Sequence, residues 1–480
     1  MHESTGAVSL HPQRWPALVM ILIAVFMDLL DATVVLIALP SLQHDLGASE
    51  TVLEWTAAGY TLAFATLLIT GGRLGDRYGR KRVLLTGLVV FILASVAAGA
   101  SVSPAMLVVS RLVQGAAAAL MIPQVLPFIQ TEFSDEERPK AIGVFGMTFA
   151  VGGVSGPLLG GLLLNADLFG WGWRTIFFIN VPFGLVCLAG VAALARESQT
   201  EAARKFDVLG LLIATVALAA LFYPLIEGQA LGWPVWILAL PVAAILVFAV
   251  FLWRERAAVG RGADPLINPA LFRSRAVSGG LAVAVFFFCG PAYGFVMTIF
   301  LQDFAGWTPL RTALTLLVFA VGVVFGSGAA TQLAPKLGRR VVIVGPLVMA
   351  VGIGMVAGAV RLGGTEVGQW QLIPGLFVAG LGMAAVATTL ITVVLGHVHW
   401  TDAGAASGVI NTTIQIGTAL GIAVIGTVFF SLLDSGPPAD AAIIALVCVA
   451  ALLLVSAALG FLLPPQQRDP VTQEQAQPTT

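Results

Sequence analysis

Residues 71–82 read GGRLGDRYGRKR and form the densest basic cluster of the chain. On both sides lie apolar stretches of about 20 residues, the length with which an α-helix crosses the hydrocarbon core of a bilayer. The same alternation of long apolar stretches and short charged connections runs from Ala17 to Leu463. The sequence therefore predicts an all-α polytopic membrane protein.

The composition excludes an ordinary soluble domain. Hydrophobic residues make up 58% of the chain and charged residues 10%, whereas a soluble domain has roughly 25% charged residues. The first apolar stretch, residues 17–38, is too long for the core of a signal peptide and contains two aspartates, so we expect it to remain as the first helix. The three cysteines lie inside apolar stretches without metal-ligand spacing, and we expect neither a metal site nor a disulfide.

Fourteen spans are predicted. Their bounds are 17–38, 52–72, 83–102, 105–128, 140–164, 175–195, 207–227, 234–253, 276–301, 309–331, 341–361, 370–395, 404–431 and 440–463. An even number places both termini on one side, and 20 of the 24 Lys and Arg residues fall on that side; the others are Arg111, Arg174, Arg311 and Arg361. Because cytoplasmic connections are enriched in basic residues, we expect both termini in the cytoplasm.

An internal repeat suggests how the spans are grouped. The segment GRLGDRYGRKRV (72–83) has a weaker counterpart in TQLAPKLGRRVV (331–342), an offset that fits a six-helix repeat interrupted by two inserted helices. We predict a cytoplasmic N-terminus (1–16), a six-helix bundle (17–200), two inserted helices (201–260), a second six-helix bundle (261–463) and a disordered cytoplasmic tail (464–480). Many secondary transporters have duplicated halves that enclose a site near the membrane midplane.

Asp31 and Arg111 are opposite charges at matched depth. Asp31 lies seven residues before the outer end of its span near Ala38, and Arg111 lies seven residues after Pro104, where its helix enters from the same side. Both are thus roughly 10 Å below the membrane surface at about 1.5 Å per residue. An unpaired charge there costs at least about 2.5–3.5 kcal/mol, so we expect the two to pair. Arginine does not deprotonate, and a transported proton must therefore sit on a carboxylate. The pattern predicts proton coupling by Asp31 and Arg111; a static structural ion pair is the alternative.

Two further polar residues lie on the same helix faces. Asp28 is one turn deeper than Asp31 and farther from Arg111, which favours its protonated form and suits a proton carrier. The alternatives are that Asp28 binds a cationic substrate, that it shares the proton with Asp31, or that it only faces a hydrated cytoplasmic crevice and has no role in transport. Gln114 lies three residues after Arg111 and is expected to bond that side chain or cavity water, unless it only joins two helices.

Several motifs in a fixed order resemble the major facilitator superfamily, in particular its 14-helix drug:proton antiporter branch. The matching segments are LLDATVVLIALP, GRLGDRYGRKR, RLVQGAAAAL, GGVSGPLLGG, WRTIFFINVPFG and SGVINTTIQIGTALGIAVIGTV. The pattern G-x-L-x-D-R-x-G-R-K is similar to one found throughout the superfamily. The pattern G-x-x-x-G-P-x-x-G-G is similar to the signature of exporters that run as antiporters.

For the connection between the second and third spans, the resemblance implies a cytoplasmic latch that steadies the outward-facing state. Its residues are Gly72, Asp76, Arg77, Gly79 and Arg80. The glycines are expected to allow a tight turn in a loop over residues 72–82, and Glu132 and the segment 134–141 are the expected partners. The alternative is a topology signal alone, with cations that retain the loop in the cytoplasm.

The fifth span has small residues on one stripe, which allow another helix to approach closely, and a proline that bends the helix. We expect this face to act in conformational change. The residues concerned are Gly152, Gly156, Pro157, Gly160 and Gly161.

Substrate contacts are expected in a cavity lined by aromatic and polar side chains, which suits planar lipophilic compounds. The residues nominated are Asp28, Tyr60, Gln114, Phe287 and Asn411. Glu227 ends a span and is expected to lie at the membrane interface rather than to carry a proton.

We therefore expect a proton-driven exporter of hydrophobic or amphipathic drugs or dyes, cationic ones in particular, and not an enzyme. The coupling proton takes the place of a cofactor, and the partners are a lipophilic small molecule and the lipid bilayer, with no nucleic acid. We expect a bacterial plasma-membrane protein that functions as a monomer. The alternatives are an exporter of one dedicated metabolite and a non-transporting receptor or scaffold.

Overall fold

The computed structural model describes residues 12–198, 207–261, 269–395 and 403–464. In these ranges the chain forms helices and short connections without a strand. They contain 14 helical segments long and apolar enough to cross a membrane, so the all-α polytopic fold and the span count are confirmed. The predicted disordered tail lies outside the described residues, apart from Pro464.

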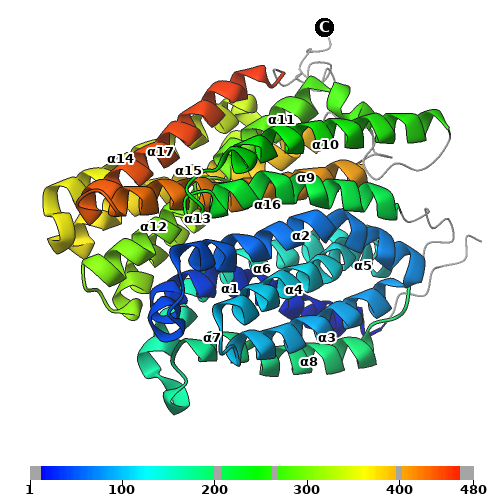
Figure 1. Ribbon diagram of the computed structural model, residues 1–480. Helices are drawn as coiled ribbons and strands as arrows, with labels where there is room; N and C mark the ends of the chain where they lie inside the picture. Colours follow the sequence, from blue (N-terminus) through cyan, green and yellow to red (C-terminus); the bar gives the residue numbers. More distant parts are fainter. Residues whose placement is uncertain (1–11, 199–206, 262–268, 396–402, 465–480) are drawn as a thin grey trace, which may run out of the picture.

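The first half of the chain occupies the lower part of Figure 1. Its helices are α1 (Arg14–Leu46), α2 (Glu50–Tyr78), α3 (Arg80–Gly99), α4 (Pro104–Met121), α5 (Val125–Glu132), α6 (Arg138–Ala166), α7 (Thr175–Phe178) and α8 (Asn180–Leu194). Gly47 ends α1 in the left-handed conformation, with φ 60°. Ser103 caps α4 by accepting a hydrogen bond from the backbone of Met106. Local capping thus fixes one end each of α1 and α4, the helices that carry Asp31 and Arg111.

The second half lies above the first in Figure 1, after two helices that connect the halves. The connecting helices are α9 (Val208–Glu227) and α10 (Val235–Gly260). The others are α11 (Arg275–Phe287), α12 (Ala292–Ile299), α13 (Pro309–Leu337), α14 (Arg339–Gly363), α15 (Gln369–Leu395), α16 (Ala403–Leu433) and α17 (Pro438–Leu459). The predicted span 276–301 is divided between α11 and α12, because Gly290 and Pro291 interrupt the helix.

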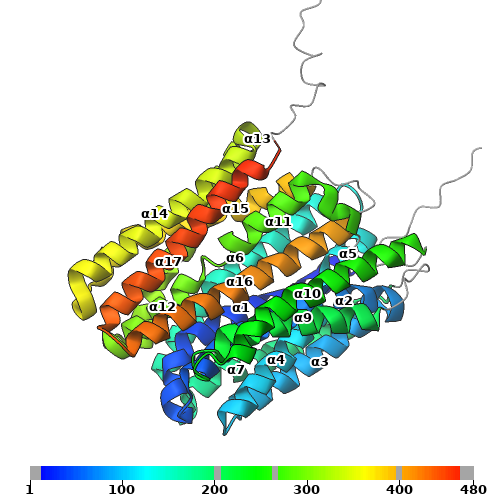
Figure 2. The same cartoon turned by 45° about the horizontal axis from the view of Figure 1, so that its top comes forward.

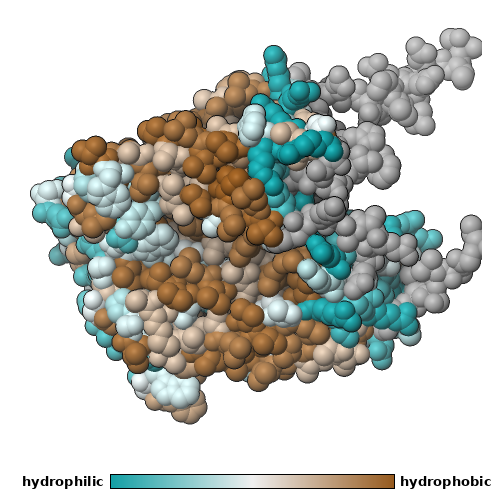
Figure 3. All heavy atoms as spheres, turned by 45° about the vertical axis from the view of Figure 1, so that its right-hand side comes forward, coloured by the Kyte–Doolittle hydropathy of each residue, from teal (hydrophilic) through white to brown (hydrophobic). Residues whose placement is uncertain are grey.

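The two halves meet mainly along two helix pairs. Helix α2 packs beside α16, and α6 packs beside α13, while α9 and α10 pack together and α9 touches both α2 and α16 (Figures 1 and 2). On the face shown in Figure 3, a broad hydrophobic band lies between two more polar ends. Exposed side chains of α10 such as Ile245 and Leu246 belong to the apolar surface that faces lipid. The predicted domain boundaries remain a prediction.

Candidate functional site: a buried polar cluster in the first half

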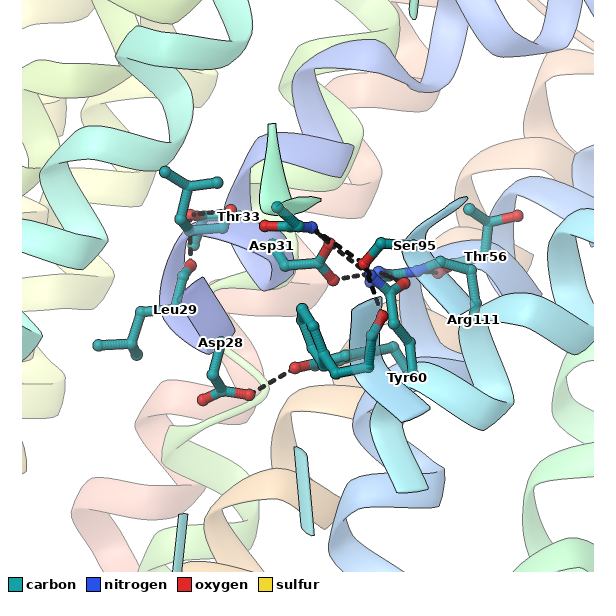
Figure 4. Close-up of polar contacts among 12 residues, drawn as sticks. Asp28, Leu29, Asp31, Thr33, Thr56, Tyr60, Ser95 and Arg111 are labelled. Carbon is teal, nitrogen blue, oxygen red and sulfur yellow. Dashed lines mark hydrogen bonds and ion pairs between the residues drawn. The ribbon is translucent and has the colours of Figure 1, made fainter. Parts of the chain in front are cut away.

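The structure brings Asp31 of α1 and Arg111 of α4 into direct contact (Figure 4). Nη1 of Arg111 donates a hydrogen bond to Oδ2 of Asp31. The Asp31 side chain is fully buried and that of Arg111 is 1% exposed. Nε of Arg111 also donates to the carbonyl of Thr56 on α2, at 3.2 Å. Because neither charge reaches water, each depends on the other and on the surrounding dipoles for its stabilisation.

Amide and hydroxyl groups complete the surroundings of Asp31. Gln114 Nε2 donates to Asp31 Oδ1 at 2.8 Å, and Gln114 Oε1 accepts from Arg111 at 2.8 Å. Asn180 of α8 donates to the same Asp31 oxygen at 2.8 Å. Ser95 of α3 accepts from Gln114 at 2.7 Å. Five elements (α1, α2, α3, α4 and α8) therefore hold one carboxylate and one guanidinium in a fixed arrangement.

Sequence reasoning nominated Gln114 but missed Ser95 and Asn180. Asn180 is the one amide side chain in the predicted span 175–195, and it lies in the WRTIFFINVPFG motif. An isolated amide in an apolar span needs a partner inside the protein, which was the available signal. Ser95 gave none, because a lone serine is common in membrane helices and bonds its own backbone, here the carbonyl of Phe91.

Close helix packing places Arg111 over an aromatic ring. A side chain at Gly115 would bring its Cβ within 2.1 Å of the Tyr60 carbonyl, so only glycine permits this approach of α4 to α2. The approach puts the Arg111 guanidinium carbon 4.3 Å from the centre of the Tyr60 ring and 5.9 Å from that of Phe177. The cation therefore has an aromatic face in addition to its carboxylate.

Asp28 lies one helical turn from Asp31 in a different environment. The hydroxyl of Tyr60 donates to Asp28 Oδ1 (Figure 4), and both side chains are buried. Within the described ranges, this hydroxyl is the hydrogen-bond partner of Asp28, and no basic side chain contacts the carboxyl group. The two neighbouring aspartates thus differ in their partners: a guanidinium and two amides face Asp31, and a neutral phenol faces Asp28.

The two nominated residues of the second half do not join this cluster. Phe287 is fully buried and packs edge-to-face on Phe288, with ring centres 5.3 Å apart. Asn411 on α16 is exposed, and its amide donates to the carbonyl of Ser407 at 3.0 Å. Of the nominated substrate contacts, Asp28, Tyr60 and Gln114 lie together, while Phe287 and Asn411 lie apart from them. Their roles as substrate contacts remain predictions.

The expected loop over residues 72–82 is wrong, because all of it except Gly79 is helical. Helix α2 continues to Tyr78 and α3 begins at Arg80, and Gly79 makes the turn with φ 102°, which favours glycine. Gly72 and Gly75 are helical instead. A Cβ on Gly75 would lie 1.9 Å from Oε1 of Gln124, so Gly75 serves a close contact with the segment after α4.

The segment that follows α8 contacts this turn. Glu197 accepts hydrogen bonds from the backbone N–H groups of Lys81 (3.0 Å) and Arg82 (3.2 Å). Arg80 is bonded to Asp76 at 3.0 Å. The expected partner Glu137 pairs instead with Arg14, whose hydrogen bonds hold the pKa of that carboxyl below its usual value. The predicted latch role of the turn remains untested.

The glycine stripe of the fifth span packs on α1. Added Cβ atoms at Gly152, Gly156 and Gly160 would meet Leu29, Thr33 and Val34 of α1 at 2.7, 1.7 and 3.0 Å. Pro157 lies inside α6 beside this stripe. A Cβ on Gly161 would instead lie 2.6 Å from Ala313 of α13, in the other half. Helix α6 therefore connects the helix that carries both aspartates with the second half of the molecule.

The profile of the Major Facilitator Superfamily matches residues 21–208 and 207–422, most of the chain. The chain belongs to the Major Facilitator Superfamily. The resemblance based on sequence motifs is thus confirmed, and the 14 apolar helices of this superfamily member place it in a membrane.

Among curated relatives, this superfamily member is 41% identical to the probable actinorhodin transporter of Streptomyces coelicolor over 88% of its own length and 74% of that protein. It is 34% identical to the multidrug resistance protein Stp of Mycobacterium tuberculosis, over 86% and 75% of the two chains. It is 35% identical to the tetracenomycin C resistance and export protein of Streptomyces glaucescens, over 89% and 78%. These relatives support a superfamily member of the drug-efflux type.

Solved structures support the fold. A bacterial homologue of the human lysosomal transporter Spinster, in an inward-facing and unoccupied conformation, aligns with a TM-score of 0.67 at 19% identity, over 94% of this chain and 97% of the other. The nucleoside transporter NupG aligns with a TM-score of 0.67 at 11% identity, over 93% and 100%. At these identities the likeness concerns the fold alone.

Proposed function

We propose that the protein is a secondary active exporter that exchanges protons for hydrophobic or amphipathic compounds, cationic ones in particular, by alternating access. The observation that carries this proposal is the buried cluster around Asp31 and Arg111, with Asp28 one turn away and, among the described residues, in contact with no basic side chain. Buried ionisable residues inside membrane spans are costly and are found where protons, ions or substrates pass.

The cluster assigns different tasks to the two aspartates. Asp31 is balanced by Arg111, so its charge requires no proton. Asp28 contacts the neutral hydroxyl of Tyr60, and a proton on Asp28 removes the cost of its buried charge. In this proposal Asp28 carries the coupling proton, and a cationic substrate replaces that proton as the positive charge at the site. Because the proton and the cationic substrate compete for the Asp28 carboxylate, the inward flux of protons is coupled to the outward flux of substrate.

The driving force is the proton gradient. One charge that crosses the membrane with its potential releases about 2.3 kcal/mol per 100 mV, before the pH difference is added. The sequence has no Gly-Lys-Ser/Thr phosphate loop with which to use ATP. We place both termini in the cytoplasm of a bacterial cell, on the basis of the basic residues counted above, so that protons enter while substrate leaves.

Export of one dedicated natural product is a second candidate. Two of the three relatives described above carry names that refer to a single compound, actinorhodin and tetracenomycin C. The same proton site would serve such an exporter, and the two candidates differ only in the range of substrates.

The proposal is tested by transport into proteoliposomes under an imposed pH gradient, with a panel of lipophilic cationic dyes. The wild type is expected to move dye against the proton flow, and Asp28→Asn is expected to lose this movement. Asp45→Asn removes a carboxylate that is 46% exposed and paired with Arg174, and serves as the control that retains transport. Transport by Asp28→Asn at the wild-type rate and pH dependence contradicts the proposal. Transport of one compound from a wider panel, rather than of many, favours the second candidate.

A further inference from the structure

A polar seam lies between the two halves, at the end of the bundle opposite Arg14 and Leu463. In it, α2 of the first half lies beside α16 of the second, and the end of α9 contacts both. Trp55 of α2 donates to Glu227 at the end of α9 at 2.9 Å. On the other side, the hydroxyl of Thr427 on α16 donates to the carbonyl of Leu225 on α9. The inserted helix α9 thus joins the two halves.

Glu54 is a buried carboxyl group within this seam. Its side chain projects from α2 and the residue is 3% exposed. Oε2 is buried without a hydrogen-bond partner. Helix α16 lies directly on the carboxyl group, because a Cβ added to Gly426 would be 2.6 Å from Oε1 of Glu54. The glycine therefore leaves room for the glutamate between the two halves.

The charged groups nearest to Glu54 are acidic. Glu50 on α2 and Glu227 on α9 both act on it electrostatically. Asp434, which follows α16, in turn acts on Glu50. Other charged groups that the structure describes on the neighbouring elements form ion pairs: His44 with Asp303, Asp45 with Arg174, and Arg111 with Asp31. Asp28 of α1 instead accepts from the hydroxyl of Tyr60. In the part of the chain that the structure describes, no three His, Cys, Asp or Glu side chains are placed to hold a metal ion.

We propose that Glu54 is a second proton-binding site, and that its proton keeps the seam between α2 and α16 closed. An ionised carboxylate without a donor or a cation is costly inside the protein, and two acidic neighbours add repulsion. The protonated acid removes both costs and fits against Gly426. Loss of the proton drives the carboxylate toward water, which it reaches when the seam separates.

This site is separate from the Asp28 and Asp31 cluster, and the inference goes beyond the proposed function. It is tested without substrate or transport, so its failure is distinguishable from failure of proton-coupled export. The native cysteines are replaced, and new ones are introduced by Ser49→Cys, just before α2, and Ser435→Cys, just after α16. Each introduced cysteine then carries a spin label. Both serines are exposed. Pulsed electron–electron double resonance then measures the distance distribution across the seam in lipid nanodiscs at a series of pH values.

The wild type is expected to show a short distance at low pH and a growing longer component as the pH rises. Glu54→Gln retains the shape of the protonated acid but does not ionise, and is expected to keep the short distance at every pH. Glu50→Gln, one turn away on the same helix and only half-buried, removes one acidic neighbour and should keep the pH response but move it to lower pH. Asp45→Asn, at a carboxylate paired with Arg174, is the control and should retain the wild-type response. A wild-type response in Glu54→Gln, or a wild type without a pH response, overturns the proposal.

Infrared spectroscopy supplies a readout of the proton itself. At neutral pH, the carbonyl stretching band of protonated carboxylic acids is expected to be weaker in Glu54→Gln than in the wild type. Equal bands in the two proteins show that Glu54 is ionised, which also overturns the proposal. A static role in packing leaves the pH response of the distance across the seam unchanged by this isosteric substitution.

Discussion

Breaking the Asp31–Arg111 pair from one side leaves a buried charge without its partner, so the stability losses of the two single variants should not add up in the double variant. The two side chains are 0% and 1% exposed, and removal of one partner from a buried ion pair costs about 3–5 kcal/mol because the remaining charge is uncompensated. We therefore expect Asp31→Asn and Arg111→Gln each to lower the free energy of unfolding by about this amount. The double variant has no buried charge left, and its loss should be smaller than the sum of the single losses by at least about 2 kcal/mol.

Equilibrium unfolding in mixed micelles, followed by a thiol-reactive fluorophore, measures these differences. The buried thiols Cys187 and Cys289 become reactive only as the protein opens. The pair Asp45 and Arg174 in the same half, with side chains 46% and 30% exposed, is the control cycle and should give a coupling of about 0–1 kcal/mol. Additive losses in the Asp31–Arg111 cycle would refute the argument that the two charges compensate each other.

Three further predictions concern packing, backbone conformation and pH. Gly115→Val forces α4 away from the α2 backbone and should lower the free energy of unfolding by at least about 1–3 kcal/mol. The Cβ of Gly153→Ala meets no atom within 4 Å, so this variant should be as stable as the wild type or more stable. Equal unfolding midpoints for the two variants would contradict this expectation. Gly79→Ala places a side chain at φ 102°, which should cost about 1–2 kcal/mol, and an unchanged unfolding midpoint would contradict the turn geometry. Hydrogen bonds from Arg14 lower the pKa of Glu137, so the stability it adds is present above its unfolded pKa of about 4.3 and is lost as the pH falls through the lower folded value. The melting temperature of the wild type should therefore exceed that of Glu137→Gln at pH 7, and this advantage should shrink below about pH 4; a difference independent of pH would contradict this assignment.

The fold followed from the sequence because membrane spans are defined by length and hydropathy alone, which a single chain displays directly. The connection over residues 72–82 was misjudged because its glycines and charges resemble a loop. In the structure only Gly79 leaves the helical conformation, while Gly75 serves a close approach to Gln124. Glycine inside a helix and glycine in a turn look the same in sequence, and the contact that distinguishes them comes from another helix.

The centre of the site was predictable to the extent that depth in the membrane constrains it. Asp31 and Arg111 lie at matched distances from the ends of their spans, and a pair is the cheapest solution for two charges at that depth. Asn180 and Ser95 also contact this cluster, but their orientation depends on how α8 and α3 rotate about their axes. The sequence pattern of nearly uniformly apolar helices does not determine that rotation.

Proton release upon substrate binding tests the central claim most directly. The purified protein, in weakly buffered detergent solution at a pH where transport occurs, is mixed with a lipophilic cation that it transports, and a pH indicator records the released protons. The account predicts release by the wild type and none by Asp28→Asn, which retains the hydrogen-bonding shape of the side chain but carries no exchangeable charge. Equal proton release by the two proteins, with equal binding of the cation, would contradict the assignment of the coupling proton to Asp28.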